Sequence, residues 1–61
     1  MPLIQVTLLE GRDNEVVEKA MKEIAKTAAE SLNAPLEAVR VVVYEVERNR
    51  FAVGTKLKSE E

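Results

Sequence analysis

Few residues of this 61-residue chain are suited to acid–base chemistry near neutral pH. The chain has no His and no Cys, and a tyrosine hydroxyl ordinarily ionises only near pH ~10. Removal of Met1 would leave Pro2 as a free secondary amine. A terminal amine has a pKa of about 7.7–8.0, and burial or a nearby cation lowers it. Pro2 is therefore a candidate general base; the alternative is a rigid residue that opens an edge strand.

Two arginines and one aromatic residue could complete a site. Arg40 interrupts a run of valines, so it either presents its planar fork to a substrate carboxylate or extends its charged head to water or to a protein carboxylate. Arg12 follows a predicted strand, at the end where parallel α/β units bind ligands, or else forms a surface ion pair with Asp13. Phe51 is either a core residue or a pocket wall. With Pro2, these residues suit an anionic, unsaturated small molecule.

The elements that must position these residues alternate between two periodicities. Residues 3–9 and 39–46 are rich in aliphatic and β-branched side chains, which predicts two strands. Between them, apolar residues recur at helical spacing from Val17 to Leu32. We therefore predict an α/β fold: a single βαβ unit with parallel strands and a short C-terminal hairpin, assembled as an oligomer. Residues 1–61 are expected to form one domain.

Local signals predict where the elements end. Asp13 is a suitable helix N-cap, and Asn33 can take the left-handed position at the helix C-terminus. Asn49 can adopt a positive φ in the turn after the second strand. A short strand is expected over residues 51–53, and residues 56–61 are expected to be a loosely held tail.

Composition limits the possible partners. The chain is 46% hydrophobic but only 3% aromatic, with a net charge of −2, so we expect no nucleic-acid partner. No apolar run approaches the ~20 residues of a membrane helix, and we expect a cytoplasmic protein without a membrane partner. No metal or other cofactor is expected, since the usual zinc and copper ligands are absent. Both predicted sheet faces are apolar, and the one helix covers only one of them, so a partner subunit is expected to cover the other.

Five segments stand in the order and spacing of the 4-oxalocrotonate tautomerase family, and the resemblance covers essentially the whole chain. They are Pro2–Gln5, Leu9–Arg12, Ala34–Leu36, Val39–Val41 and Arg50–Phe51. The resemblance implies an isomerase of aromatic hydrocarbon catabolism that acts on 2-hydroxymuconate or a similar 2-hydroxydienoate and forms a homohexamer, a trimer of dimers.

The resemblance also implies a role for each candidate residue. Pro2 would be the general base and acid. Arg12 would hold the distal carboxylate of the substrate, and Arg40 of a neighbouring subunit would hold the carboxylate and oxygen at its other end. Phe51 and Leu9 would line the pocket.

The chain departs from the usual family pattern at two positions and lacks two residues of the dehalogenase relatives. Asn49 and Ala52 replace hairpin glycines that are usual in the family. Dehalogenase relatives carry an arginine near the position of Leu9 and a carboxylate near that of Val53. This chain has neither, which argues against hydration or dehalogenation. A non-catalytic oligomeric module of the same fold is the alternative, particularly if Met1 is retained, because the Pro2 nitrogen would then be an amide. A tautomerase with a different physiological substrate is a further possibility.

Overall fold

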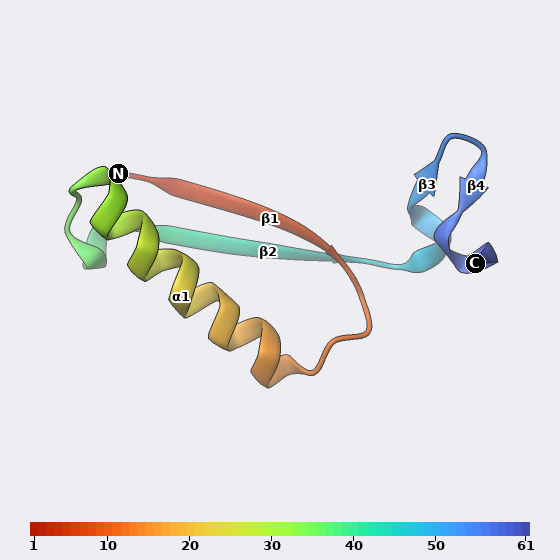
Figure 1. Ribbon diagram of the computed structural model, residues 1–61, viewed down its shortest axis with the longest axis horizontal. Coiled ribbons are helices and arrows are strands. Elements are labelled where there is room, and N and C mark those ends of the chain that lie inside the picture. The colour runs from red at the N-terminus through yellow and green to blue at the C-terminus, as the bar shows by residue number, and fades with distance from the viewer.

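The computed structural model describes residues 1–61. Its strands and α-helix are β1 (Leu3–Leu9), α1 (Asn14–Leu32), β2 (Arg40–Val46), β3 (Ala52–Val53) and β4 (Lys56–Leu57), and its 3₁₀ turns cover Leu36–Ala38, Arg48–Arg50 and Lys58–Glu60. β1 and β2 pair in parallel, and α1 lies across one face of the two-stranded sheet (Figure 1). The predicted βαβ unit with a short C-terminal hairpin is confirmed.

The ends of α1 follow from the residues at its two boundaries. Asn33 has φ 55° and ψ 46°, and its backbone N–H donates to the carbonyls of Ala29 and Glu30, as predicted for a left-handed C-terminal residue. Asp13 has an extended backbone at the N-terminal end, but its side chain makes no capping hydrogen bond. The Asp13 carbonyl accepts instead from the N–H groups of Val16 and Val17, so only the position of the cap was predicted correctly.

The strand register separates the residues of the sheet into two sets. Partnered residues of parallel strands point to the same side, and β1 residues Ile4, Val6 and Leu8 are half-buried on the side that α1 covers. Val17 of α1 is the only buried residue, with 7% of its surface exposed. Leu32, at the predicted end of the apolar helix stripe, is 61% exposed. The core of one chain is therefore thin.

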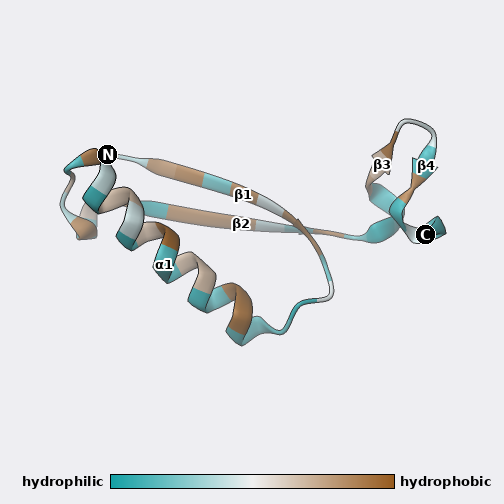
Figure 2. Ribbon diagram, in the orientation of Figure 1, coloured by the Kyte–Doolittle hydropathy of each residue, from teal (hydrophilic) through white to brown (hydrophobic).

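The second sheet face is uncovered and carries both apolar and polar side chains. We call it the open face; it consists of Leu3, Gln5, Thr7 and Leu9 of β1 and their β2 partners Arg40, Val42, Tyr44 and Val46. Figure 2 shows that hydrophobic residues run along both strands. The radius of gyration is 14.4 Å, whereas a compact domain of this length has about 10.5 Å. One chain alone is thus more extended than a compact domain of the same length.

The C-terminal hairpin projects away from the βαβ unit (Figure 1). β3 and β4 are antiparallel, with Ala52 opposite Leu57, so the prediction of a loose tail over residues 56–61 was wrong. The N–H of Lys58 donates to the Phe51 carbonyl at 2.8 Å, and Glu60 Oε1 accepts from the Leu57 N–H at 2.6 Å. These bonds hold the segment in place.

Two other sequence expectations concern the turn before the hairpin and the length of the helix. The predicted turn after the second strand is present as a 3₁₀ turn over residues 48–50, and Asn49 does not adopt the positive φ that it tolerates. None of the helices combines the length and the apolar composition needed to cross a bilayer.

Candidate active site

Pro2 and Arg40 lie together at the amino end of the sheet. The N–H of Arg40 donates to the Pro2 carbonyl at 2.9 Å, so parallel pairing fixes the two residues side by side. Pro2 is half-buried, and Met1 before it is 84% exposed. While Met1 is attached, the Pro2 nitrogen is a tertiary amide without a basic lone pair. This end of the sheet can supply a base only after Met1 is removed.

The Arg40 side chain is exposed and belongs to the open face. Its Nη1 donates to the Glu37 carbonyl at 2.8 Å. Within one chain the guanidinium is therefore held against a backbone carbonyl and pairs with no protein carboxylate, and its other N–H groups are unpaired within the chain. A guanidinium has five N–H donors, so four remain for a carboxylate.

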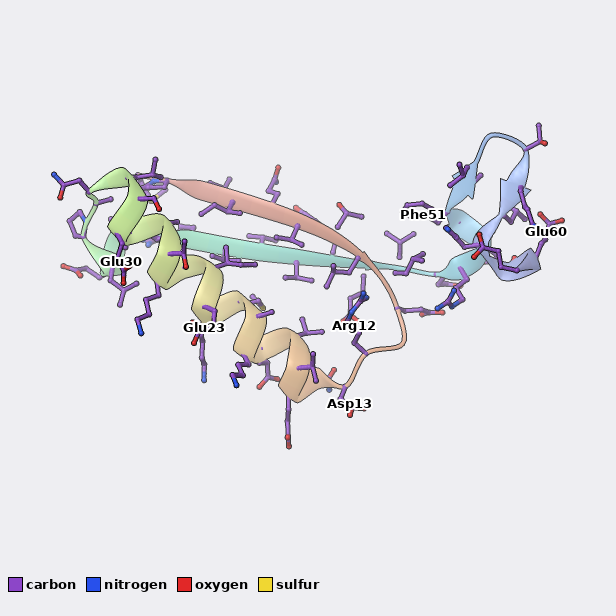
Figure 3. All side chains as sticks on the ribbon, in the orientation of Figure 1. Arg12, Asp13, Glu23, Glu30, Phe51 and Glu60 are labelled. Atoms are coloured by element: carbon purple, nitrogen blue, oxygen red, sulfur yellow. The ribbon has the colours of Figure 1, made fainter.

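Leu9, Arg12 and Phe51 are associated with the opposite, carboxyl end of the sheet. Arg12 lies in the β1–α1 loop, and its Nη1 donates to the Leu9 carbonyl at 3.2 Å. Arg12 forms no ion pair with Asp13. The only ion pair in the structure joins Lys58 and Glu61. Phe51 is half-buried at the base of the hairpin (Figure 3). The loop reaches Arg12 through Gly11, whose φ of 123° is unfavourable for any side chain.

The two groups of residues do not meet within one chain. Seven residues of β1 separate them, and at ~3.3 Å per residue the strand holds Pro2 and Arg12 more than about 20 Å apart. A six-carbon dienoate is far shorter than this. A site that contains both Pro2 and Arg12 therefore requires residues from more than one chain.

Sequence reasoning missed the backbone carbonyls of Leu9 and Glu37 that hold the two guanidinium groups. No sequence signal could have revealed them, because every residue carries a carbonyl. The one hollow of the surface, of 380 Å³, lies elsewhere, between the end of α1 and the following connection, and is lined by Lys26, Ala29, Glu30, Ala34 and Leu36. No group of His, Cys, Asp or Glu side chains that could hold a metal ion is present.

Solved structures with the same arrangement define the class of fold. A 4-oxalocrotonate tautomerase homologue in the tomaymycin biosynthetic pathway is 44% identical, with a TM-score of 0.92, over 97% of this chain and 91% of that one. A heterohexameric 4-oxalocrotonate tautomerase from Chloroflexus aurantiacus is 32% identical, with a TM-score of 0.94, over 98% and 97% of the two chains. The fold is thus that of the 4-oxalocrotonate tautomerases.

The family follows from the sequence comparisons. Residues 2–61 match the family model described as tautomerase enzyme. A 2-hydroxymuconate tautomerase from Pseudomonas putida is 39% identical over 59 residues, which cover 97% of this chain and 94% of that protein. The chain belongs to the tautomerase family, as the resemblance of its five segments indicated, and it is an isomerase-type enzyme.

Proposed function

We propose that this tautomerase moves a proton within 2-hydroxymuconate or a similar 2-hydroxydienoate to give the conjugated 2-oxo acid. The observation that carries the proposal is the similarity to the P. putida 2-hydroxymuconate tautomerase along nearly the whole chain. The region that matches the tautomerase family begins at Pro2, the residue to which we assign the base.

In the proposed mechanism, the Pro2 amine is neutral when substrate binds. It removes the proton of the 2-hydroxyl group, and the electron pair moves along the conjugated chain. The same proton then returns from the Pro2 ammonium group to a carbon further along, so the reaction has no net proton change. Arg12 and Arg40 favour the neutral amine by like-charge repulsion. Half-burial of Pro2 acts in the same direction.

The two arginines hold the ends of the substrate. Arg12, which must come from a different chain than Pro2, binds the distal carboxylate and draws electron density toward it. Arg40 of a neighbouring subunit binds the carboxylate and oxygen at the other end. Charge-assisted bonds from a planar guanidinium fit both tasks. Phe51 and Leu9, which are half-buried, form an apolar wall that strengthens these electrostatic contacts by excluding water.

The active enzyme is proposed to be a cytoplasmic homohexamer, a trimer of βαβ dimers, that acts in aromatic hydrocarbon catabolism. The open face and the separation of Pro2 from Arg12 support an oligomer, since both require a second chain. An antiparallel arrangement of two chains would bring the amino end of one sheet to the carboxyl end of the other. The Chloroflexus relative is described as a heterohexamer, which supports the number of subunits.

A second candidate function depends on whether Met1 is removed. Met1 precedes Pro2 in the chain described here, and a population that retains Met1 has no basic Pro2 nitrogen. Such a population would be a non-catalytic oligomeric module of the same fold. Processing of Met1 thus separates the two functions.

The Pro2→Ala variant tests the proposal. Loss of a positioned acid–base group lowers turnover by about 10² or more, so this variant should tautomerise 2-hydroxymuconate at least 10²-fold more slowly than the parent protein, with intact masses confirming that both lack Met1. Pro35→Ala is the matched control, because Pro35 lies in the connection after α1. Equal turnover of the Pro2 variant and the parent would refute the role of Pro2.

A further inference from the structure

Three polar side chains lie at the centre of the open face, and Arg40 lies at its amino end. Thr7 and Tyr44 are direct partners in the register, and Gln5 precedes Thr7 by two residues on the same side. Gln5 Nε2 donates to Tyr44 Oη at 3.5 Å. We call Gln5, Thr7 and Tyr44 the polar cluster. Tyr44 is 51% exposed, so the cluster is open to solvent in a single chain.

The accessible surface of the whole chain, including the projecting hairpin, is larger than that of a compact monomer. One chain exposes 4878 Å², whereas a monomeric protein of 6.8 kDa has about 4,000 Å². The difference of roughly 900 Å² is close to the ~800 Å² that each partner buries in a standard protein interface. The occupant we infer is a further copy of this chain, and this step rests on the assembly contained in the proposed function.

Covering the face changes the hydrogen bonding of the cluster. A glutamine amide has two donor hydrogens and an acceptor oxygen, and each hydroxyl both donates and accepts. The long Gln5–Tyr44 contact is the only hydrogen bond that these side chains make in one chain, so water must satisfy the remaining groups. A second copy would exclude that water, and buried polar groups without partners are costly. Only a surface with complementary polar groups in register can cover the cluster without this loss.

We propose that Gln5, Thr7 and Tyr44 form the hydrogen-bonded centre of the interface between copies of this chain and select identical copies as partners. The surrounding aliphatic side chains, such as Val42 and Val46, supply affinity but little discrimination, since apolar surfaces tolerate many registers. A chain that presents only apolar groups opposite the polar cluster would leave the polar groups of the cluster unpaired and would bind less tightly. The cluster therefore acts as a specificity determinant for self-assembly.

The fluorescence of Tyr44 tests this inference without any substitution. The chain has one Tyr and no Trp, so tyrosine emission reports on this site alone. Acrylamide should quench Tyr44 readily in diluted, dissociated protein, and at least fivefold less efficiently in the assembled protein. Free N-acetyltyrosinamide serves as the reference for full access. Equal quenching of the assembled and dissociated protein would overturn the inference.

Substitutions test the selection of partners. Tyr44→Phe and Gln5→Met each leave polar partners unpaired, and each should weaken association about tenfold or more. The double variant should lose less than the product of the two effects, because it removes the unpaired groups together. Thr27→Val, which removes a hydroxyl from the exposed side of α1, should associate like the parent. Single variants that associate as tightly as the parent would contradict the role of the cluster.

Subunit exchange followed by native mass spectrometry completes the test. Isotope-labelled parent protein should exchange freely with unlabelled parent, but at least tenfold less with the double variant. Free exchange with the double variant would contradict the selection of identical copies. Turnover of 2-hydroxymuconate by the parent is measured as well, so that failure of this inference can be told apart from failure of the proposed function. An active assembly with a fully quenched Tyr44 overturns this inference alone, whereas a protected Tyr44 in an inactive assembly supports it and counts against the proposed function.

Discussion

Placing a charge on the open face should separate folding of the subunit from assembly. Val42 lies opposite Gln5 in the register, on the side of the sheet away from α1. In the Val42→Glu variant, the new carboxylate would point into the space that a second chain is proposed to occupy. In a free subunit the same carboxylate would reach water, so the βαβ unit should still form.

The expected magnitude follows from the surroundings of Val42. An unpaired charge in a dry protein interior costs about 3–5 kcal/mol, and loss of the buried valine side chain adds about 1.5 kcal/mol. Arg40 is the only cation of the open face, and it lies two residues from Val42 on the same side of β2. Only one of its N–H groups is bonded, to the Glu37 carbonyl, so a contact with the new carboxylate would recover part of this cost. We therefore expect association to weaken by at least about 10²-fold at 1.4 kcal/mol per factor of ten.

Sedimentation velocity across a range of protein concentrations measures this effect. Val16→Glu is the matched control, because Val16 is 55% exposed in the first turn of α1, where a negative charge is favourable. The control should assemble like the parent, whereas Val42→Glu should remain a small species and lose tautomerase activity. If both variants assembled alike at every concentration, the open face would not be the interface.

Three further predictions concern single side chains. Arg40→Ala should raise the substrate concentration for half-saturation about tenfold or more, because a charge-assisted bond to the substrate is lost. Lys22→Ala on α1 should leave it unchanged. Unaltered saturation kinetics of the Arg40 variant would contradict the role of Arg40. Asn33→Ala should lower the free energy of unfolding by about 1 kcal/mol because of the positive φ, and Asn33→Gly should not; chemical denaturation compares the two, and equal losses would refute the argument. Glu60→Ala should speed hydrogen exchange of the Leu57 amide by about fivefold through loss of their bond; an unchanged exchange rate by NMR would show that this bond does not hold the hairpin.

The elements with strong local signals could be predicted from the sequence. The bounds of β1 follow from its aliphatic run, and the end of α1 follows from Asn33, whose backbone angles are those that a left-handed terminus requires. Residues 56–60 were mispredicted because their structure depends on contacts across the hairpin. The bond from Lys58 to the Phe51 carbonyl has no signature in a segment of alternating charges.

The candidate site was predictable as a set of residues but not as an arrangement. Pro2 and Arg12 flank the two ends of β1, so their separation follows once the strand is known. The sequence periodicity of one chain does not show how a second chain would bring its Arg12 close to Pro2 of the first. The backbone acceptors of the two guanidinium groups were equally unpredictable, because side-chain direction depends on the final loop geometry.

The state of the Pro2 nitrogen is the most direct test of the proposed chemistry. Protein prepared with Met1 retained and protein with Met1 removed can be distinguished by intact mass and assayed side by side on 2-hydroxymuconate. The account predicts that the processed form is the active one and that the residual rate of the other preparation scales with its processed fraction. Equal turnover by a fully Met1-retaining preparation would contradict the assignment of Pro2 as the base.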